Sequence, residues 1–126
     1  MNKFNYQPIG IIHSPFKGRE GTPIQPIGAI GVGAEVEIFP EYVEGLQDLE
    51  GFSHIILLYH CHLSQTYKLT VKPFLDDADH GLFATRAPAR PNPIGISLVR
   101  LIRNENATLF DQDIDNIYQT PLLDIK

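Results

Sequence analysis

The sequence predicts an all-β domain, a barrel or a sandwich, with one short helix and long loops. The first observation is strict alternation, because Ala34, Val36 and Ile38 are apolar whereas Glu35 and Glu37 between them are charged. Such alternation is typical of a strand with one buried face. The second observation is that further short apolar or alternating segments recur along the chain, separated by Gly, Pro, Asn and Asp. Many short strands at this spacing favour a barrel or a sandwich.

The individual elements follow from the same patterns. Tyr42, Leu46 and Leu49 recur at near-helical spacing, which predicts one short helix over Glu41 to Gly51. Ser53 to Cys61 is almost wholly apolar and too short for a buried helix, so it predicts a central strand covered on both faces. The predicted strands are Pro8 to His13, Ala34 to Phe39, Ser53 to Cys61, Tyr67 to Lys72, Leu82 to Thr85, Ile94 to Leu101, Ala107 to Phe110, Ile114 to Tyr118 and Leu122 to Ile125.

Length and composition define the class of protein. A chain of 126 residues is expected to form a single domain, residues 1–126, with its own core and without a C-terminal second domain. No apolar run reaches the roughly 18 to 20 residues of a membrane span, and the N-terminus lacks the apolar core of a signal peptide. The single Cys61 excludes an internal disulfide. We therefore expect a soluble, cytoplasmic protein.

The charge of the chain is unevenly distributed. The net charge of −5 argues against a general nucleic-acid binder, which is usually basic. From Glu20 to Tyr67 the sequence has no Lys or Arg. Basic side chains resume immediately afterwards, at Lys68, Lys72, Arg86, Arg90, Arg100 and Arg103. Either these residues form one locally basic zone that could hold RNA phosphates, or they are scattered over different strand faces.

The segment from Arg86 to Pro93, here called the proline-rich loop, is the most specific feature of the sequence. Its three prolines lack N–H donors, which excludes the segment from the interior of a sheet and stiffens it. Arg90 and Asn92 each precede a proline and are therefore held extended. A guanidinium on a stiff loop is suited to a carboxylate or a phosphate. The alternative is an ordinary connector that carries two surface arginines.

Two other motifs resemble known kinds of binding site. His60, Cys61 and His62 would supply two metal ligands from one side of a strand, but no other histidine has a diagnostic spacing to the pair. We therefore expect no metal site. The segment Thr22 to Gly33 is rich in glycine, but its GAIGVG spacing matches neither a dinucleotide-binding fingerprint nor a Walker loop.

Several stretches together resemble one known family. The string ATRAPARPNPIGIS, the N-terminal IGIIHSPFK followed by PIQP, the block GLQDLEGFSHIILLYH and the closing TPLLDIK occur in the order of the TsaA-like family. The resemblance covers Ile9 to Lys126. Members of that family are S-adenosylmethionine-dependent tRNA methyltransferases that modify N6 of a threonylcarbamoylated adenosine beside the anticodon. The resemblance implies a closed, mostly antiparallel β-barrel, S-adenosyl-L-methionine as cofactor, tRNA as substrate, and a homodimer with the donor pocket near the subunit boundary.

The resemblance also implies which residues form the site. The methyl donor would be bound by Pro23, Ile24, Gln25, His62, Leu63, Arg86, Leu98, Thr120 and Pro121, and the acceptor side would be formed by Arg90 and Asn92. Methyl transfer depends chiefly on alignment of donor and acceptor, so neither a nucleophilic triad nor a metal is required. No catalytic residue is identified, and Tyr59, His62 and Tyr118 are the candidates for a general base.

The chain departs from the family pattern at three places. Tyr118 and Gln119 replace an Asp-Gly pair, Leu63 replaces a residue that is often polar, and the sequence ends at Lys126. Three hypotheses therefore stay open. The chain is a tRNA methyltransferase, or an S-adenosylmethionine-binding module of the same fold without that activity, or a metal-binding or regulatory protein built around His60 and His62.

Overall fold

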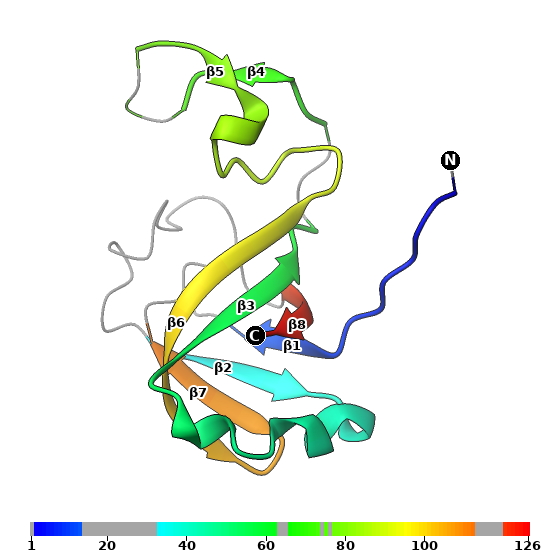
Figure 1. Ribbon diagram of the computed structural model, residues 1–126, viewed down its shortest axis with the longest axis vertical. Helices are drawn as coiled ribbons and strands as arrows, with labels where there is room; N and C mark the ends of the chain where they lie inside the picture. Colours follow the sequence, from blue (N-terminus) through cyan, green and yellow to red (C-terminus); the bar gives the residue numbers. More distant parts are fainter. Residues whose placement is uncertain (1, 14–32, 63–65, 74, 76, 113–119) are drawn as a thin grey trace.

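The computed structural model describes residues 2–13, 33–62, 66–73, 75, 77–112 and 120–126. Six antiparallel strands form a closed barrel in the order β1-β2-β7-β6-β3-β8 (Figure 1). They are β1 (Gly10–His13), β2 (Gly33–Ile38), β3 (His54–His60), β6 (Ile94–Glu105), β7 (Thr108–Gln112) and β8 (Thr120–Ile125). The predicted all-β barrel is therefore confirmed. In the described part of the chain, no helix is long and apolar enough to cross a membrane.

Strand β8 closes the barrel by pairing with both β1 and β3. Gly10 lies opposite Leu122 in the β1–β8 ladder, and Tyr59 lies opposite the same Leu122 in the β3–β8 ladder. The beginning of β8 is thereby brought to the end of β3. Two segments that the family resemblance assigns to the donor site, around His62 and around Thr120, consequently meet at one end of the barrel.

The core is formed by the inward side chains of these strands. The alternation predicted for β2 is confirmed, since Ala34, Val36 and Ile38 are buried and Glu35 and Glu37 are exposed. The five other strands of the barrel and η2 supply the remaining side chains of this core: Ile12, Leu46, Ile55, Leu57, Val99, Leu109 and Leu122. Burial of these apolar surfaces is the main stabilising contribution to the fold.

The predicted central strand is confirmed in position but not in burial on both faces. Strand β3 has partners on both sides, β6 and β8. However, Ile55 and Leu57 are buried whereas His54 and His60 on the other face are exposed. A barrel has one interior, so a strand that is central in its hydrogen bonding can still have an outer face.

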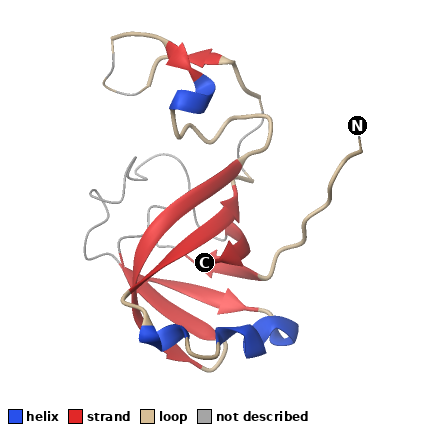
Figure 2. Ribbon diagram, viewed as in Figure 1, coloured by secondary structure: helices blue, strands red, loops and turns tan. Residues whose placement is uncertain are grey.

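The predicted helix over Glu41 to Gly51 consists of two short 3₁₀ stretches. They are η2 (Pro40–Leu46) and η3 (Leu49–Gly51) (Figure 2). The break falls at Asp48, whose φ of 69° is left-handed and cannot continue a right-handed helix. Leu46 is buried against the core, so the near-helical spacing identified the correct inward residue although the helix type differs.

Two other expectations were wrong in detail. Leu82 to Thr85 is not a strand, because Leu82–Ala84 forms a 3₁₀ turn, η4, which the Thr85 hydroxyl caps by donating to the Leu82 carbonyl over 2.7 Å. The strand expected from Tyr67 to Lys72 is reduced to β4 (Thr70–Val71), which pairs with β5 (His80–Gly81). The strand expected from Ile114 to Tyr118 lies outside the described residues.

The small β4–β5 sheet and η4 form a lobe that extends from one end of the barrel (Figure 1). Leu82 is almost fully buried there, and its backbone N–H donates to the Leu69 carbonyl over 2.8 Å. The proline-rich loop leads from this lobe back into β6. The segments η2 and η3 lie at the opposite end of the barrel (Figure 2).

Asp111 is a carboxyl group inside the barrel. Its relative exposure is 1%, and neither carboxylate oxygen has a hydrogen-bond partner within the described residues. Its neighbours in the ladders are the apolar Ala34 of β2 and Leu101 of β6. Burial raises the pKa of Asp111 from 3.8 to about 7. The carboxyl group is therefore protonated in the folded protein at mildly acid pH.

The raised pKa of Asp111 predicts a pH-dependent stability. Between about pH 4 and pH 7 the folded state keeps a proton that the unfolded chain has released, so the free energy of unfolding falls as the pH rises through this window. The Asp111→Asn variant does not ionise at this position. Relative to it, the free energy of unfolding of the wild type should fall by roughly 2 to 3 kcal/mol between pH 5 and pH 8. Urea unfolding at both pH values measures this difference. A constant difference between the two proteins would contradict the prediction.

Candidate functional site

The proline-rich loop is attached to the end of β3 by a backbone hydrogen bond, and a second, local bond lies where the loop enters β6. The Cys61 N–H donates to the Pro93 carbonyl over 2.7 Å, and the Ile94 N–H donates to the Asn92 carbonyl over 2.7 Å. These bonds lie directly beyond the last β3–β6 pair, His60 with Ile94. The loop is therefore held to the barrel at its C-terminal end, where β6 begins.

Arg90 anchors the loop from within. Its guanidinium Nη1 donates to the Thr85 carbonyl over 3.3 Å and to the Ala87 carbonyl over 3.0 Å. The side chain is half-buried. A planar guanidinium that joins a carbonyl of its own loop to the carbonyl of the residue just before the loop restricts the conformation of that loop. This contact adds an internal positioning role to the acceptor-side role predicted for Arg90.

Arg86 lies over the beginning of β6. Its Nη2 donates to the Ile96 carbonyl, and the residue is exposed. A guanidinium has five N–H donors, so this bond leaves donors for a ligand carboxylate. Arg86 is thus positioned by the barrel and accessible from solvent, as the sequence predicts for a residue that recognises an anion.

A tyrosine packs beneath the start of β6. Tyr59 and Gly95 are paired across β3 and β6, and the Tyr59 hydroxyl is 2.9 Å from Ser97 Oγ. A Cβ atom at position 95 would overlap the Tyr59 ring. Gly95 therefore makes room for the ring, and Ser97, which is 1% exposed, accepts or donates the hydroxyl hydrogen bond. Tyr59 is a candidate general base from the sequence, and the structure places its hydroxyl against the interior of the barrel.

The His60-Cys61-His62 run does not continue the strand geometry. Strand β3 ends at His60, and the His62 N–H donates to the His60 carbonyl over 2.9 Å. This tight turn ends the alternation that would have placed both imidazoles on one side. Cys61 is buried and His62 is exposed. Among the described residues no group of three His, Cys, Asp or Glu is arranged to hold a metal ion.

Thr120 and Pro121 begin β8 at the same end of the barrel. Thr120 is 2% exposed and lies opposite Ile12, whereas Pro121 is half-buried. Because Leu122 lies opposite Tyr59, residues before it in β8 run alongside the end of β3. The structure therefore brings the predicted donor residues His62, Thr120 and Pro121 to one region.

Leu98 lies apart from that region. It is on the outer face of β6, 58% exposed, and pairs with Ile56 of β3. It is four residues beyond Ile94, which corresponds to about 13 Å along a strand. Within one chain, Leu98 therefore lies away from the predicted donor residues at the barrel end. The predicted residues Pro23, Ile24, Gln25 and Leu63 lie outside the described residues.

The basic residues divide into two groups. Lys68, Lys72, Arg86 and Arg90 belong to the lobe and the proline-rich loop. Arg100 and Arg103 lie further along β6, where Arg103 pairs with Glu105 over 3.2 Å and stacks on the Phe110 ring at 4.0 Å from its centroid. The six basic residues therefore do not form one basic zone, which was one of the two alternatives that the sequence allowed.

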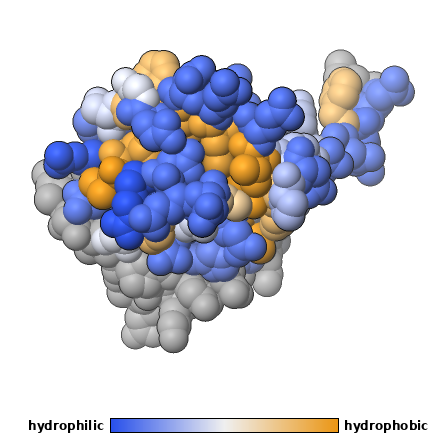
Figure 3. Space-filling model, turned by 90° about the horizontal axis from the view of Figure 1, so that it is seen from below, coloured by the Kyte–Doolittle hydropathy of each residue, from blue (hydrophilic) through white to orange (hydrophobic). Residues whose placement is uncertain are grey.

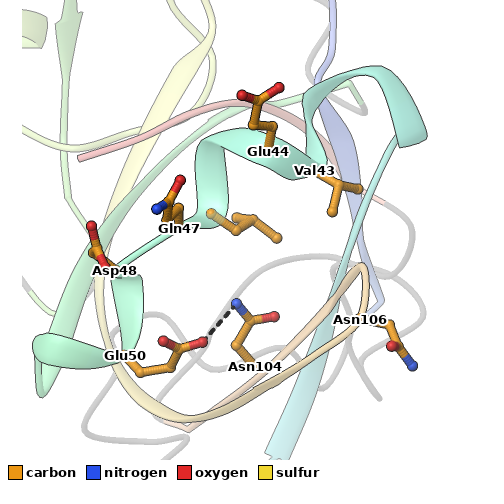
Figure 4. A pocket seen from close by; sticks show the side chains of 8 residues that line it. Val43, Glu44, Gln47, Asp48, Glu50, Asn104 and Asn106 are labelled. Atoms are coloured by element: carbon orange, nitrogen blue, oxygen red, sulfur yellow. Dashed lines mark hydrogen bonds between the residues drawn. The ribbon is translucent and has the colours of Figure 1, made fainter.

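An open pocket of about 400 Å³ lies at the opposite end of the barrel, under η2 and η3 (Figure 4). It contains none of the predicted site residues. Glu50 Oε1 accepts a hydrogen bond from Asn104 Nδ2 over 3.2 Å inside it. The other residues that line it are Val43, Glu44, Leu46, Gln47, Asp48 and Asn106. Viewed from below, hydrophilic side chains cover much of this end of the molecule (Figure 3).

Comparison with known proteins identifies the family. Residues 11–126 match the domain family described as the tRNA-methyltransferase O N-terminal domain, TrmO_N. The chain belongs to this family. The TrmO_N match covers the barrel, the lobe and the proline-rich loop, and agrees with the resemblance read from the sequence.

Individual relatives share both sequence and fold with this TrmO_N chain. A probable S-adenosyl-L-methionine-binding protein of Pyrococcus abyssi is 55% identical over 96% of the chain. The tRNA (adenine(37)-N6)-methyltransferase of Escherichia coli is 34% identical over 100% of it. The crystal structure of TrmO from Pseudomonas aeruginosa superimposes with a TM-score of 0.81 at 38% identity over 100% of the chain. The chain spans 66%, 58% and 55% of these three proteins, respectively.

Two features of this TrmO_N domain were not identified from the sequence: the partner of Tyr59 and the burial of Asp111. The Tyr59–Ser97 contact joins residues 38 positions apart, and only the β3–β6 register brings them together. Buried Asp111 follows buried Leu109 at the strand period of two, so the alternation could have indicated its inward direction. Asp is normally charged and exposed, so a search for apolar residues does not identify Asp111 as a buried position.

The contact of Tyr59 with Gly95 predicts the effect of a methyl group at position 95. Gly95→Ala should force the Tyr59 ring or β6 to move, and should lower the free energy of unfolding by about 1 to 3 kcal/mol. Urea unfolding measures this change. Gly33→Ala is the matched control, because a Cβ at that strand glycine meets no atom of the described residues within 4 Å. Equal effects of the two substitutions would contradict the predicted clash.

Proposed function

We propose that this chain is an S-adenosyl-L-methionine-dependent methyltransferase that acts on N6 of the threonylcarbamoylated adenosine beside the tRNA anticodon. The observation that carries the proposal is the TrmO_N match over residues 11–126 together with a stiff loop that presents an accessible Arg86 at the barrel end. The Escherichia coli relative is named a tRNA (adenine(37)-N6)-methyltransferase, which supports the same acceptor atom.

The residues at the barrel end suit the proposed donor. Arg86 would pair with the donor's carboxylate through the guanidinium donors that Ile96 does not use. His62 and the backbone around Thr120 and Pro121 would border the same donor, because β8 starts beside the end of β3. S-adenosyl-L-methionine supplies the reactive methyl group on its sulfonium sulfur. The described residues of this site therefore bind and orient the donor.

The proposed reaction is a direct displacement. The lone pair of the acceptor N6 forms a bond to the methyl carbon while the carbon–sulfur bond breaks, which releases S-adenosylhomocysteine. The N6 proton then passes to solvent or to a basic side chain. The contribution of the protein is alignment of N6, carbon and sulfur, and alignment alone can supply a large part of a rate enhancement. A loop held by Arg90 and by the Cys61–Pro93 bond limits the freedom of the aligned groups.

Arg86→Ala should weaken binding of S-adenosyl-L-methionine by tenfold or more, because a charge-assisted contact with the donor carboxylate is lost. Isothermal titration calorimetry with the donor and with S-adenosylhomocysteine measures both affinities. Arg103→Ala is the control, since Arg103 is an exposed arginine engaged with Glu105 and Phe110 away from the loop. Unchanged donor affinity in Arg86→Ala would exclude the assigned role.

A methyl-transfer assay separates the two leading functions. Transfer of radiolabelled methyl groups to threonylcarbamoylated tRNA, with little transfer to tRNA that lacks the modification, would support the proposed acceptor. Donor binding without transfer to either tRNA would favour the second candidate, an S-adenosyl-L-methionine-binding module. The Pyrococcus abyssi relative is named as such a binding protein, and Tyr118-Gln119 is the sequence feature that favours this candidate.

We also propose that the chain acts as a homodimer. The outer β3–β6 face is an apolar surface formed by paired side chains, Ile56 beside Leu98 and Leu58 beside Ile96, with Ile94 next to them. Ile94, Ile96 and Leu98 are 41%, 47% and 58% exposed. Adjacent exposed aliphatic side chains favour a protein interface. A two-fold partner would cover this face and could bring its own Leu98 to the donor pocket, which the separation within one chain does not allow.

Leu98→Asp should convert the dimer to a monomer, because a charge would be buried at the centre of the outer β3–β6 face. Light scattering after size exclusion measures the mass, and Phe52→Asp, at an exposed aromatic beyond that face, is the control. If pockets are shared between subunits, mixing Leu98→Ala chains with Arg86→Ala chains should restore about a quarter of the donor sites. A wild-type monomer, or no restoration on mixing, would contradict the shared pocket.

A further inference from the structure

The chain begins with an extended arm. Residues 2–8 form neither strand nor helix and are exposed. The arm leaves the barrel next to β1 and projects away from it (Figures 1 and 3). Two contacts define its base, since Gln7 Nε2 donates to the Tyr42 hydroxyl over 2.9 Å and the Ile9 N–H donates to the Leu122 carbonyl over 2.8 Å. Beyond Gln7, towards the N-terminus, the aromatic side chains extend into solvent.

The chemistry of the arm differs from that of the rest of the protein. Phe4 and Tyr6 are 75% and 77% exposed. Lys3 precedes them, and amide side chains occupy positions 2, 5 and 7. The first carboxylate of the sequence is Glu20, although the chain as a whole carries a net charge of −5. Exposed aromatic rings together with a cation and hydrogen-bonding amides, in the absence of carboxylates, are the features of a single-stranded nucleic-acid contact.

The spacing of the two rings suits a stacked base. In an extended chain, residues i and i+2 point to the same side and lie about 6.6 Å apart. Successive stacked bases are about 3.4 Å apart along a strand, so a planar base between two rings requires about 6.8 Å. Phe4 and Tyr6 are two positions apart, so their side chains have about this spacing in an extended chain. An unpaired base could therefore be held between the two rings.

We propose that this arm binds single-stranded RNA, with a base stacked between Phe4 and Tyr6 and a neighbouring phosphate held by Lys3. The proposal rests on the proposed function for the identity of the nucleic acid, since tRNA presents an unpaired loop around the acceptor adenosine. The arm thereby supplies an RNA contact on an acidic protein. It adds a substrate-binding element that lies outside the residues 11–126 matched by the family.

The charge distribution favours this side of the molecule for RNA. The arm rises from β1 towards the end of the barrel that carries the lobe and the proline-rich loop, whereas η2 and η3 lie at the other end (Figure 1). That other end carries Glu41, Glu44, Asp48 and Glu50, and no Lys or Arg occurs between Glu20 and Tyr67. Arg103 also lies near this end, next to the pocket residue Asn104, but it is paired with Glu105. The end therefore keeps an excess of negative charge, which repels phosphates. RNA is thus directed towards the arm and the loop. The arm has no Leu, Ile or Val before Ile9, which favours RNA over an apolar protein groove as its partner.

The test uses the full chain and a fluorescein-labelled single-stranded oligoribonucleotide, with binding followed by fluorescence anisotropy. The double variant Phe4→Ser, Tyr6→Ser should bind at least tenfold more weakly, because stacking on aromatic rings is lost. Phe52→Ser is the matched control, an aromatic residue with 64% exposure outside the arm, and should bind like the wild type. Lys3→Gln should weaken binding less and reduce its dependence on salt.

Three results would overturn the proposal: no binding of the oligonucleotide by the wild type, equal binding by the arm variant, or an equal loss in Phe52→Ser. A lower molecular mass of the arm variant by light scattering, with unchanged RNA binding, would assign the arm to a contact between copies of the chain. Donor titration of the arm variant separates this proposal from the proposed function, since the arm should not affect donor affinity. If the wild type does not bind the donor, the proposed methyltransferase function is refuted, whereas arm-dependent RNA binding would still stand.

Discussion

The antiparallel ladder between β3 and β6 is the interaction on which the site depends. Seven consecutive residue pairs join the two strands, from His54 with Arg100 to His60 with Ile94, and the Cys61–Pro93 backbone bond continues the contact into the proline-rich loop. The ladder places Tyr59 against Gly95, positions the Ile96 carbonyl for Arg86, and aligns the apolar residues of the outer face. A shift of one residue would reverse the side of every one of these side chains.

Closure of the barrel brings the start of β8, with Thr120 and Pro121, to the end of β3. Strand β8 is inserted between β1 and β3, so that segments more than a hundred residues apart in sequence become neighbours, as Gly10 and Leu122 do. Among the described residues, the barrel interior contains an ionisable side chain, Asp111. Its burial is tolerated because the carboxyl group can remain protonated. The groups proposed to bind ligands, in contrast, lie at the barrel end and on the projecting segments, where ligands can reach them.

The structure shows different contacts for the two arginines of the proline-rich loop. Arg90 turns inward and ties its own loop together, whereas Arg86 is held at one nitrogen and presents the rest of its guanidinium to solvent. Proline spacing indicated that both were positioned, but could not indicate which carbonyls would accept their hydrogen bonds. The partners Thr85, Ala87 and Ile96 depend on how the loop folds back on β6.

The sequence by itself determined the all-β class, the buried face of β2, the stiffness of the proline-rich loop and the family, because these properties reside in local alternation, in proline geometry and in ordered motifs. The tertiary structure decided that Leu98 faces outward, far from His62, that Leu82–Ala84 is a turn rather than a strand, and that Asp111 is buried. These depend on strand register and barrel closure, which are set by contacts between distant segments and leave no signal within a short stretch of sequence.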